Sequence, residues 1–132
     1  MSVDSLPYSL VPLGFPFPAL SARAGRLPLG GGREVALAAL MAAHLAENVR
    51  GEFAVGQPER ATRASQAKIW LASLALPAAT RASLTRCVDA TAGSPTQVAT
   101  ALRSVIAAAS AHLDGAAVQE LEVLARQLVG GS

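Results

Sequence analysis

Helix-breaking residues divide the chain at nearly even intervals, and this spacing constrains the fold more than any other feature. Pro58, Pro77, Pro95 and Gly115 follow one another at steps of 19, 18 and 20 residues. Proline suits the first turn of a helix but not its interior, so the three prolines favour helix starts. The segments between these positions carry apolar residues at three- and four-residue steps, which is typical of amphipathic helices. The sequence therefore predicts a run of short helices after residue 32.

These segments predict an all-α fold, a bundle of four to five short Ala-rich helices. We expect helices over residues 33–50, 58–75, 77–91, 95–113 and 115–129. Alanine favours the helix by propensity and lets helix axes approach closely, but it buries little area. Equal spacing is also typical of helix-turn-helix repeats, so a solenoid of two repeats is the alternative to a bundle.

The last two helices have the clearest start signals. Ser94, Pro95 and Gln97 form a capping-box pattern, in which the side chains at the first and last of these positions bind each other's backbone N–H groups. Asp114 is a candidate N-cap for the helix that follows it. Both starts should therefore be visible as side-chain hydrogen bonds.

The sequence of residues 1–32 predicts an extended arm and not a helix. Between residues 6 and 20, four prolines interrupt an apolar stretch that holds three of the chain's five aromatic residues. Large apolar side chains alternate there with small residues or proline, so an extended chain places each group of them on one side. We expect this arm, with Trp70 as an aromatic anchor on the helices, to bind a partner. The predicted partner-binding residues are Leu6, Tyr8, Leu10, Leu13, Phe15, Phe17 and Trp70.

The arm divides the predicted organisation into two parts, an apolar Pro-rich arm with a glycine joint over residues 1–32 and a helical domain over residues 33–132. Gly30, Gly31 and Gly32 form the joint, which we expect to be flexible. Such a joint allows the arm to dock on its own bundle, on a second copy of the chain or on another protein. The sequence leaves these three possibilities open.

Composition favours a globular chain that binds another protein. Charged residues make up 15% of the chain against about 25% in a typical domain, which suggests that part of the surface is covered by a partner. No apolar run reaches the roughly 20 residues that a membrane span needs. Cys87 is the only cysteine, so no disulfide can form within the chain. We expect a cytoplasmic protein.

A cluster of basic residues lies in the middle of the chain, and it supports an alternative function. If these residues share one face of the second and third helices, they could bind the phosphates of DNA or an acidic protein. A DNA-binding regulator is therefore the second hypothesis. The possible basic patch consists of Arg60, Arg63, Lys68, Arg81 and Arg86.

The sequence offers little chemistry for catalysis, and we expect no catalytic, metal or cofactor site. His44 and Glu47 have a spacing seen in helical metal sites, but such sites need further carboxylates. We expect His44 at the edge of an apolar face, Cys87 as a small buried side chain and His112 near a helix end. A third hypothesis is a small helical enzyme or ligand-binding domain with a pocket near His44 and Trp70.

The first hypothesis is a non-enzymatic protein–protein interaction module. An adaptor, an assembly factor or a small accessory subunit would use the arm and an Ala-lined groove between helices to bind a protein or a second copy of the chain.

Overall fold

The computed structural model describes residues 32–49 and 56–130. These residues form five α-helices and one 3-10 turn: α2 (Arg33–Glu47), α3 (Gln57–Ala72), α4 (Ala78–Ala90), α5 (Pro95–Ala109), η1 (Ser110–His112) and α6 (Gly115–Gly130). The described part of the chain contains no strand, so the predicted all-α bundle is confirmed. The predicted arm residues lie outside the described residues, apart from Gly32.

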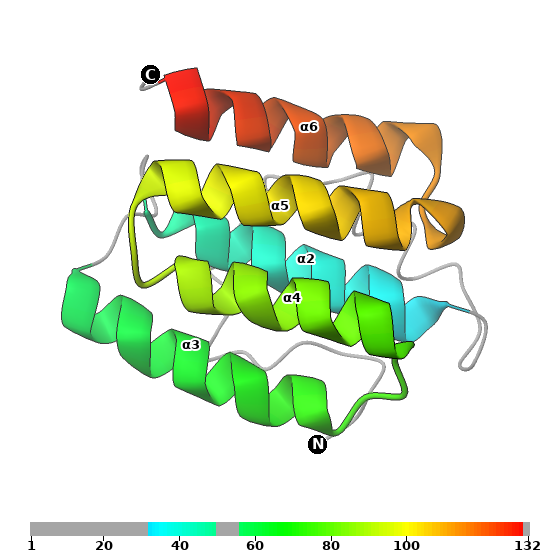
Figure 1. Ribbon diagram of the computed structural model, residues 1–132, viewed down its shortest axis with the longest axis horizontal. Helices are drawn as coiled ribbons and strands as arrows, with labels where there is room; N and C mark the ends of the chain where they lie inside the picture. Colours follow the sequence, from blue (N-terminus) through cyan, green and yellow to red (C-terminus); the bar gives the residue numbers. More distant parts are fainter. Residues whose placement is uncertain (1–31, 50–55, 131–132) are drawn as a thin grey trace.

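Four of the helices form one layer, in chain order. α3, α4, α5 and α6 lie side by side, each antiparallel to its neighbour, as expected from the short connections between them (Figure 1). α2 packs on one face of this layer and contacts α4, α5 and α3. The evenly spaced helix starts are therefore realised as two consecutive helical hairpins, with a fifth helix laid across them.

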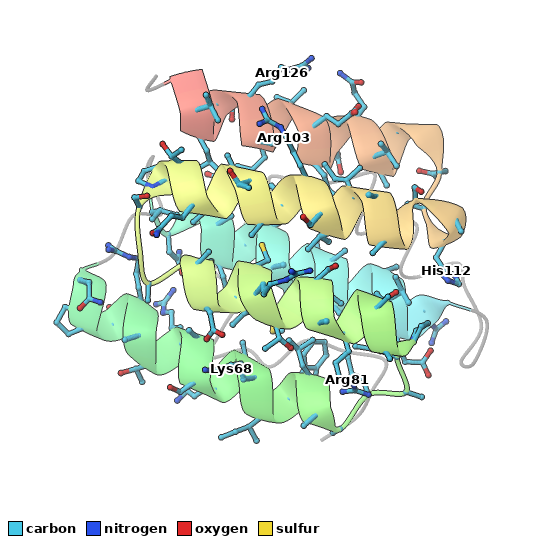
Figure 2. The ribbon with its side chains drawn as sticks, in the orientation of Figure 1. Lys68, Arg81, Arg103, His112 and Arg126 are labelled. Carbon is cyan, nitrogen blue, oxygen red and sulfur yellow. The ribbon has the colours of Figure 1, made fainter. Side chains whose placement is uncertain are left out.

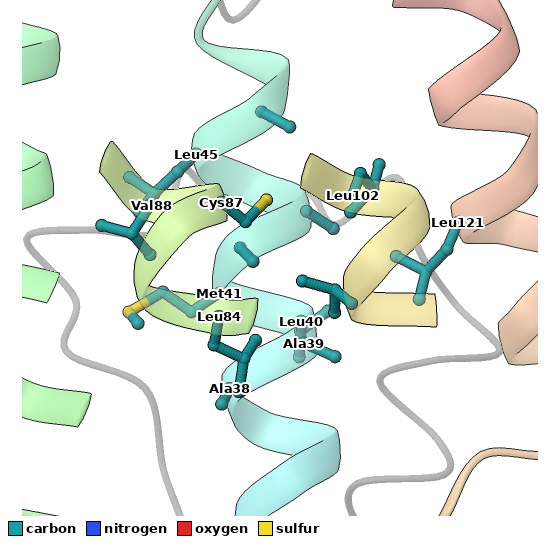
Figure 3. Packing of buried hydrophobic residues seen from close by; sticks show 14 of the residues in the cluster. Ala38, Ala39, Leu40, Met41, Leu45, Leu84, Cys87, Val88, Leu102 and Leu121 are labelled. Atoms are coloured by element: carbon teal, nitrogen blue, oxygen red, sulfur yellow. The ribbon is translucent and has the colours of Figure 1, made fainter. Parts of the chain in front are cut away.

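The core lies between α2 and the layer. Met41 and Leu45 of α2 meet Leu84 and Val88 of α4, while Leu102 of α5 lies in the same cluster (Figure 3). The alanines of α2 let its axis come close to the layer. Six of them are fully buried: Ala36, Ala38, Ala39, Ala42, Ala43 and Ala46.

The predicted caps are confirmed. The Ser94 hydroxyl accepts from the Gln97 backbone N–H at 3.3 Å, and the Gln97 side-chain oxygen accepts from the Ser94 N–H at 3.0 Å. Asp114 Oδ1 accepts from the Ala117 N–H at 2.9 Å. These bonds involve residues three apart in sequence, which is why local pattern predicts them well.

Three predicted helix ends were wrong. The second helix stops at Ala72, with Ser73 as its C-cap, and does not continue to residue 75. The first helix stops at Glu47, with Asn48 as its C-cap, and does not continue to residue 50. The helix that starts at Pro95 does not stay α-helical to residue 113, because the chain tightens into the 3-10 turn at Ser110 and becomes extended at Leu113. None of the described helices combines the length and the apolar character that crossing a membrane requires.

Candidate functional site

The outer face of α5 carries an exposed ridge with a groove on each side. Thr96, Thr100, Arg103 and Ala107 follow one another at steps of four, three and four residues, so they share one side of the helix. The opposite side carries Val98, Leu102, Val105 and Ala109, all fully buried. The ridge therefore lies on the face of the layer that points away from α2.

The groove between α5 and α6 has an apolar floor and charged edges. It has a volume of about 280 Å³ and is lined by Arg103, Ile106, Ala107, Glu122, Ala125 and Arg126. Figure 2 shows Arg103 in front of the space between the two helices, with Arg126 on the neighbouring part of α6. Alanine leaves the groove open because its side chain is too short to fill the space between the helices.

The two arginines at this groove are not used by the fold. Neither Arg103 nor Arg126 makes a hydrogen bond or ion pair with any described residue, including Glu122 in the same groove. Two cations and one carboxylate give the groove a net positive charge. Val129, whose side chain is 50% exposed, extends the apolar surface, because it lies four residues beyond Ala125 on α6.

The groove between α4 and α5 is also mostly apolar. It has a volume of about 350 Å³ and is lined by Arg86, Thr96, Gln97, Thr100, Ala101 and Ser104. The Gln97 side chain is already bound in the capping box of α5. This groove offers Arg86 and hydroxyl groups beside a mostly apolar surface.

The structure places most of the predicted basic patch in bonds that hold α3 and α4 together. The Arg81 guanidinium, near the start of α4, donates to the carbonyls of Leu71 and Leu74 at the end of α3, at 2.7 and 2.6 Å. Arg60, near the start of α3, donates to the carbonyl of Thr91 at the end of α4, at 3.0 Å. Each arginine thus binds carbonyls in the last turn of the neighbouring helix or just after it, and the Leu71 carbonyl also accepts from the backbone N–H of Leu74.

Two further members of the patch are also bound to protein groups. Arg63 donates to Asn48 of α2 at 3.0 Å and to Glu59 at 3.1 Å. Lys68 forms an ion pair with Asp89 at 2.7 Å. Arg86 is exposed and lines the α4–α5 groove, so the five residues do not form one free cationic face.

The predicted arm residues Leu6, Tyr8, Leu10, Leu13, Phe15 and Phe17 lie outside the described residues. Trp70 is buried, with 2% of its surface exposed, and its Nε1 has no hydrogen-bond acceptor among the described residues. It lies two helical turns after Arg63, on the side of α3 that faces α2. As a buried core residue it is not a free anchor on the described surface, and whether it meets the arm stays a prediction.

The residues weighed for catalysis or metal binding lie apart from the grooves. His44 is fully buried and not at the edge of its helix face, and burial lowers the pKa of its imidazole to about 4. Burial likewise raises the pKa of the Cys87 thiol to about 12, so this cysteine is a poor nucleophile, as expected of a small buried side chain. The described residues contain no group of three or more metal-binding side chains.

Sequence reasoning missed the α5–α6 groove. The spacing of Arg103, Ile106 and Ala107 shows that they share one side of a helix, which is a local signal. Their meeting with Glu122, Ala125 and Arg126 depends on how α6 packs against α5, and no local pattern reports that packing.

Comparisons with protein-family models, with curated proteins and with solved structures found no significant match to this chain.

Proposed function

We propose that this chain is a non-enzymatic protein-interaction module, such as an adaptor, an assembly factor or a small accessory subunit. The observation that carries the proposal is the α5–α6 groove, where Arg103 and Arg126 stand unbound at the edges of an apolar floor. By contrast, Arg60, Arg63 and Arg81 line neither groove, and each donates hydrogen bonds to other groups of the protein.

The groove fits an amphipathic helical segment with acidic residues. Such a segment would place apolar side chains on Ile106, Ala107 and Ala125 and carboxylates beside Arg103 and Arg126. Arginine binds carboxylates through two parallel N–H donors, which supplies orientation as well as attraction. The groove holds no nucleophile and no histidine, so it supports binding better than catalysis.

The DNA-binding alternative has less support. Arg60, Arg63, Lys68 and Arg81 would have to exchange their protein partners for phosphates. Breaking the Arg81 bonds would also take the donor from the Leu74 carbonyl just after α3, while the Leu71 carbonyl would keep the backbone N–H of Leu74.

A selection of random helical peptides on the full chain tests the proposed function. Selected peptides should carry acidic residues at three- and four-residue steps beside apolar ones. Their binding should fall at least tenfold for the double variant Arg103→Glu, Arg126→Glu and should weaken as salt is raised. The matched control is Arg86→Glu, which changes an exposed arginine at the neighbouring groove and should bind normally. Equal binding by the double variant would overturn the proposal.

A further inference from the structure

The α5–α6 groove carries its charged side chains at two levels along its length. Figure 2 shows Arg103 of α5 and Arg126 of α6 at the same level along the two helices, and both line the groove. Glu122 lies four residues before Arg126, which places it one turn, about 6 Å, closer to the start of α6. One level of the groove therefore holds two cations, and the next level holds a carboxylate.

The residues of α5 at the level of Glu122 carry no charge. Ile106 and Ala107 lie three and four residues after Arg103, so they are one turn closer to the end of α5. Because α5 and α6 are antiparallel neighbours, the end of α5 and the start of α6 lie at the same end of the groove (Figure 1). Glu122 thus lies across the groove from an apolar stretch of α5 and not from a third arginine.

The three charged groups are not neutralised within the described part of the chain. Glu122 and Arg126 have the four-residue spacing of a helical ion pair, yet they form no such pair with each other. Neither they nor Arg103 make a hydrogen bond or ion pair with any other described residue, and all three are exposed. A ligand in the groove therefore meets a cationic level and an anionic level, each with its charge available.

The separation of the two levels matches one turn of a helix in the ligand. A helical segment that lies along the groove presents residues four apart on the same face, about 6 Å from each other. When its carboxylates lie beside Arg103 and Arg126, its residue one turn closer to the α5–α6 connection lies beside Glu122. An acidic residue at that position is repelled by Glu122, and a lysine or arginine is attracted.

We infer that Glu122 selects partners whose groove-binding helix carries a basic residue one turn beyond its acidic residues. The inference rests on the proposed function, because it specifies the charge pattern of the segment that the same groove binds. Acidic residues followed by a basic one meet this pattern when the partner helix runs in the direction of α5, since Ala107 follows Arg103. The two arginines attract the segment, and Glu122 rejects segments that are acidic along their whole length.

A second copy of the chain has a similar charge pattern but lacks the apolar side chains. Glu122 precedes Arg126 by four residues on the exposed side of α6, so α6 itself has an acidic residue one turn before a basic one. Among the described residues of α6, however, Val129 is the one large apolar side chain that is exposed. The α6 helix of a second copy would leave the apolar floor of the groove largely uncovered, so we expect a different protein as the partner.

Two synthetic helical peptides test the inference on the full chain. Both carry leucines on one face and two glutamates three residues apart. They differ only four residues after the second glutamate, where one peptide has lysine and the other has glutamate. The lysine peptide should bind the wild type at least about threefold more tightly, measured by titration calorimetry at low salt. Glu122→Lys should reverse this order, and Glu122→Gln should remove the preference for lysine.

The arginine variant separates a failure of this inference from a failure of the proposed function. Arg103→Glu with Arg126→Glu should weaken the binding of both peptides. If it does so, but the wild type and Glu122→Lys bind the two peptides in the same ratio, the charge selection is wrong while the groove still binds helices. If neither peptide binds the wild type, the proposed function and the inference both fail.

Sedimentation of the free chain tests the second copy as the occupant. We expect the wild type and Glu122→Lys to sediment alike. A dimer of the wild type that Glu122→Lys dissociates would show that α6 of a second copy fills the groove, and it would overturn the inference.

Discussion

Gly32 and Gly115 both stand at helix starts, but their surroundings differ. Gly32 has a left-handed backbone with φ 101°, and a Cβ there would lie 2.7 Å from Nδ1 of His112. A Cβ at Gly115 would meet nothing within 4 Å. At Gly32 the chain thus enters α2 along a path that only glycine fits without strain, so this member of the predicted flexible joint has a defined structural role.

These surroundings predict opposite effects of the same substitution. Gly32→Ala should lower the free energy of unfolding by about 1 kcal/mol or more, because of the strained φ and the contact with His112. Gly115→Ala should raise it by about 0.4–1 kcal/mol, because alanine restricts the unfolded chain and fits the folded one. Urea unfolding of both variants beside the wild type checks the signs. A loss of stability at Gly115 as large as that at Gly32 would contradict this account.

His44 makes stability depend on pH in a defined window. Its pKa falls from 6.5 to about 4 on burial, so between these values the unfolded chain binds a proton that the folded chain does not. Stability present above pH 6.5 is therefore lost as the pH falls toward 4, at up to about 1.4 kcal/mol per pH unit.

His44→Leu should remove this dependence. Between pH 6.5 and 5 the wild type should lose about 1–2 kcal/mol more than the variant, measured by urea unfolding at each pH. The difference between their free energies of unfolding at each pH removes the contribution of the other titrating groups, which the two proteins share. If the free energy of unfolding of the two proteins fell equally between pH 6.5 and 5, the pKa of His44 would be the same in the folded and unfolded chain, and this account would be wrong.

At the scale of the elements, α3 and α4 bind each other's ends through arginine. Arg81 supplies two donors to the last turn of α3, and Arg60 supplies one to the end of α4. A cation at a helix C-terminus is also favoured by the helix dipole. These bonds explain why α3, an edge helix of the layer, stays attached to it although its outer side exposes Ile69.

Arg81→Met should therefore lower the free energy of unfolding by about 1–3 kcal/mol, because two carbonyls lose their charged donor while the aliphatic stem is kept. Arg86→Met is the matched control and should change it by less than about 0.5 kcal/mol, since Arg86 is exposed. Chemical denaturation of both variants distinguishes them. Similar values for the two would mean that the Arg81 bonds do not hold α3 in place.

The sequence predicted those elements whose signals are local. The capping box at Ser94 and the N-cap at Asp114 each join residues three apart in sequence, so both could be located without knowledge of the fold. Arg60 and Arg81 were grouped with a surface patch, because nothing local shows that the antiparallel packing of α3 on α4 brings each to the other helix's end. The full burial of His44 was missed for the same reason, since burial depends on what lies against a helix and not on its own period.

At the scale of the whole molecule, α2 is the central element. It lies against the layer of α3 to α6, and all its residues from Glu34 to Ala46 are buried. A layer of four Ala-rich helices cannot by itself surround a fifth. The outer face of α5, on the side of the layer away from α2, is the surface that we propose for a partner.

The most direct test of this account is the stability of the full chain after the arm's aromatic side chains are shortened. If residues 6–20 pack on the helices, as the sequence analysis allows, Phe15→Ala with Phe17→Ala should lower the free energy of unfolding in urea by at least about 2 kcal/mol, because shortening phenylalanine side chains in a core removes their contacts. Ile69→Ala is the control, since this side chain is 74% exposed, and it should change stability by less than about 0.5 kcal/mol. If the double variant unfolds at the same urea concentration as the control, the arm is not part of the core.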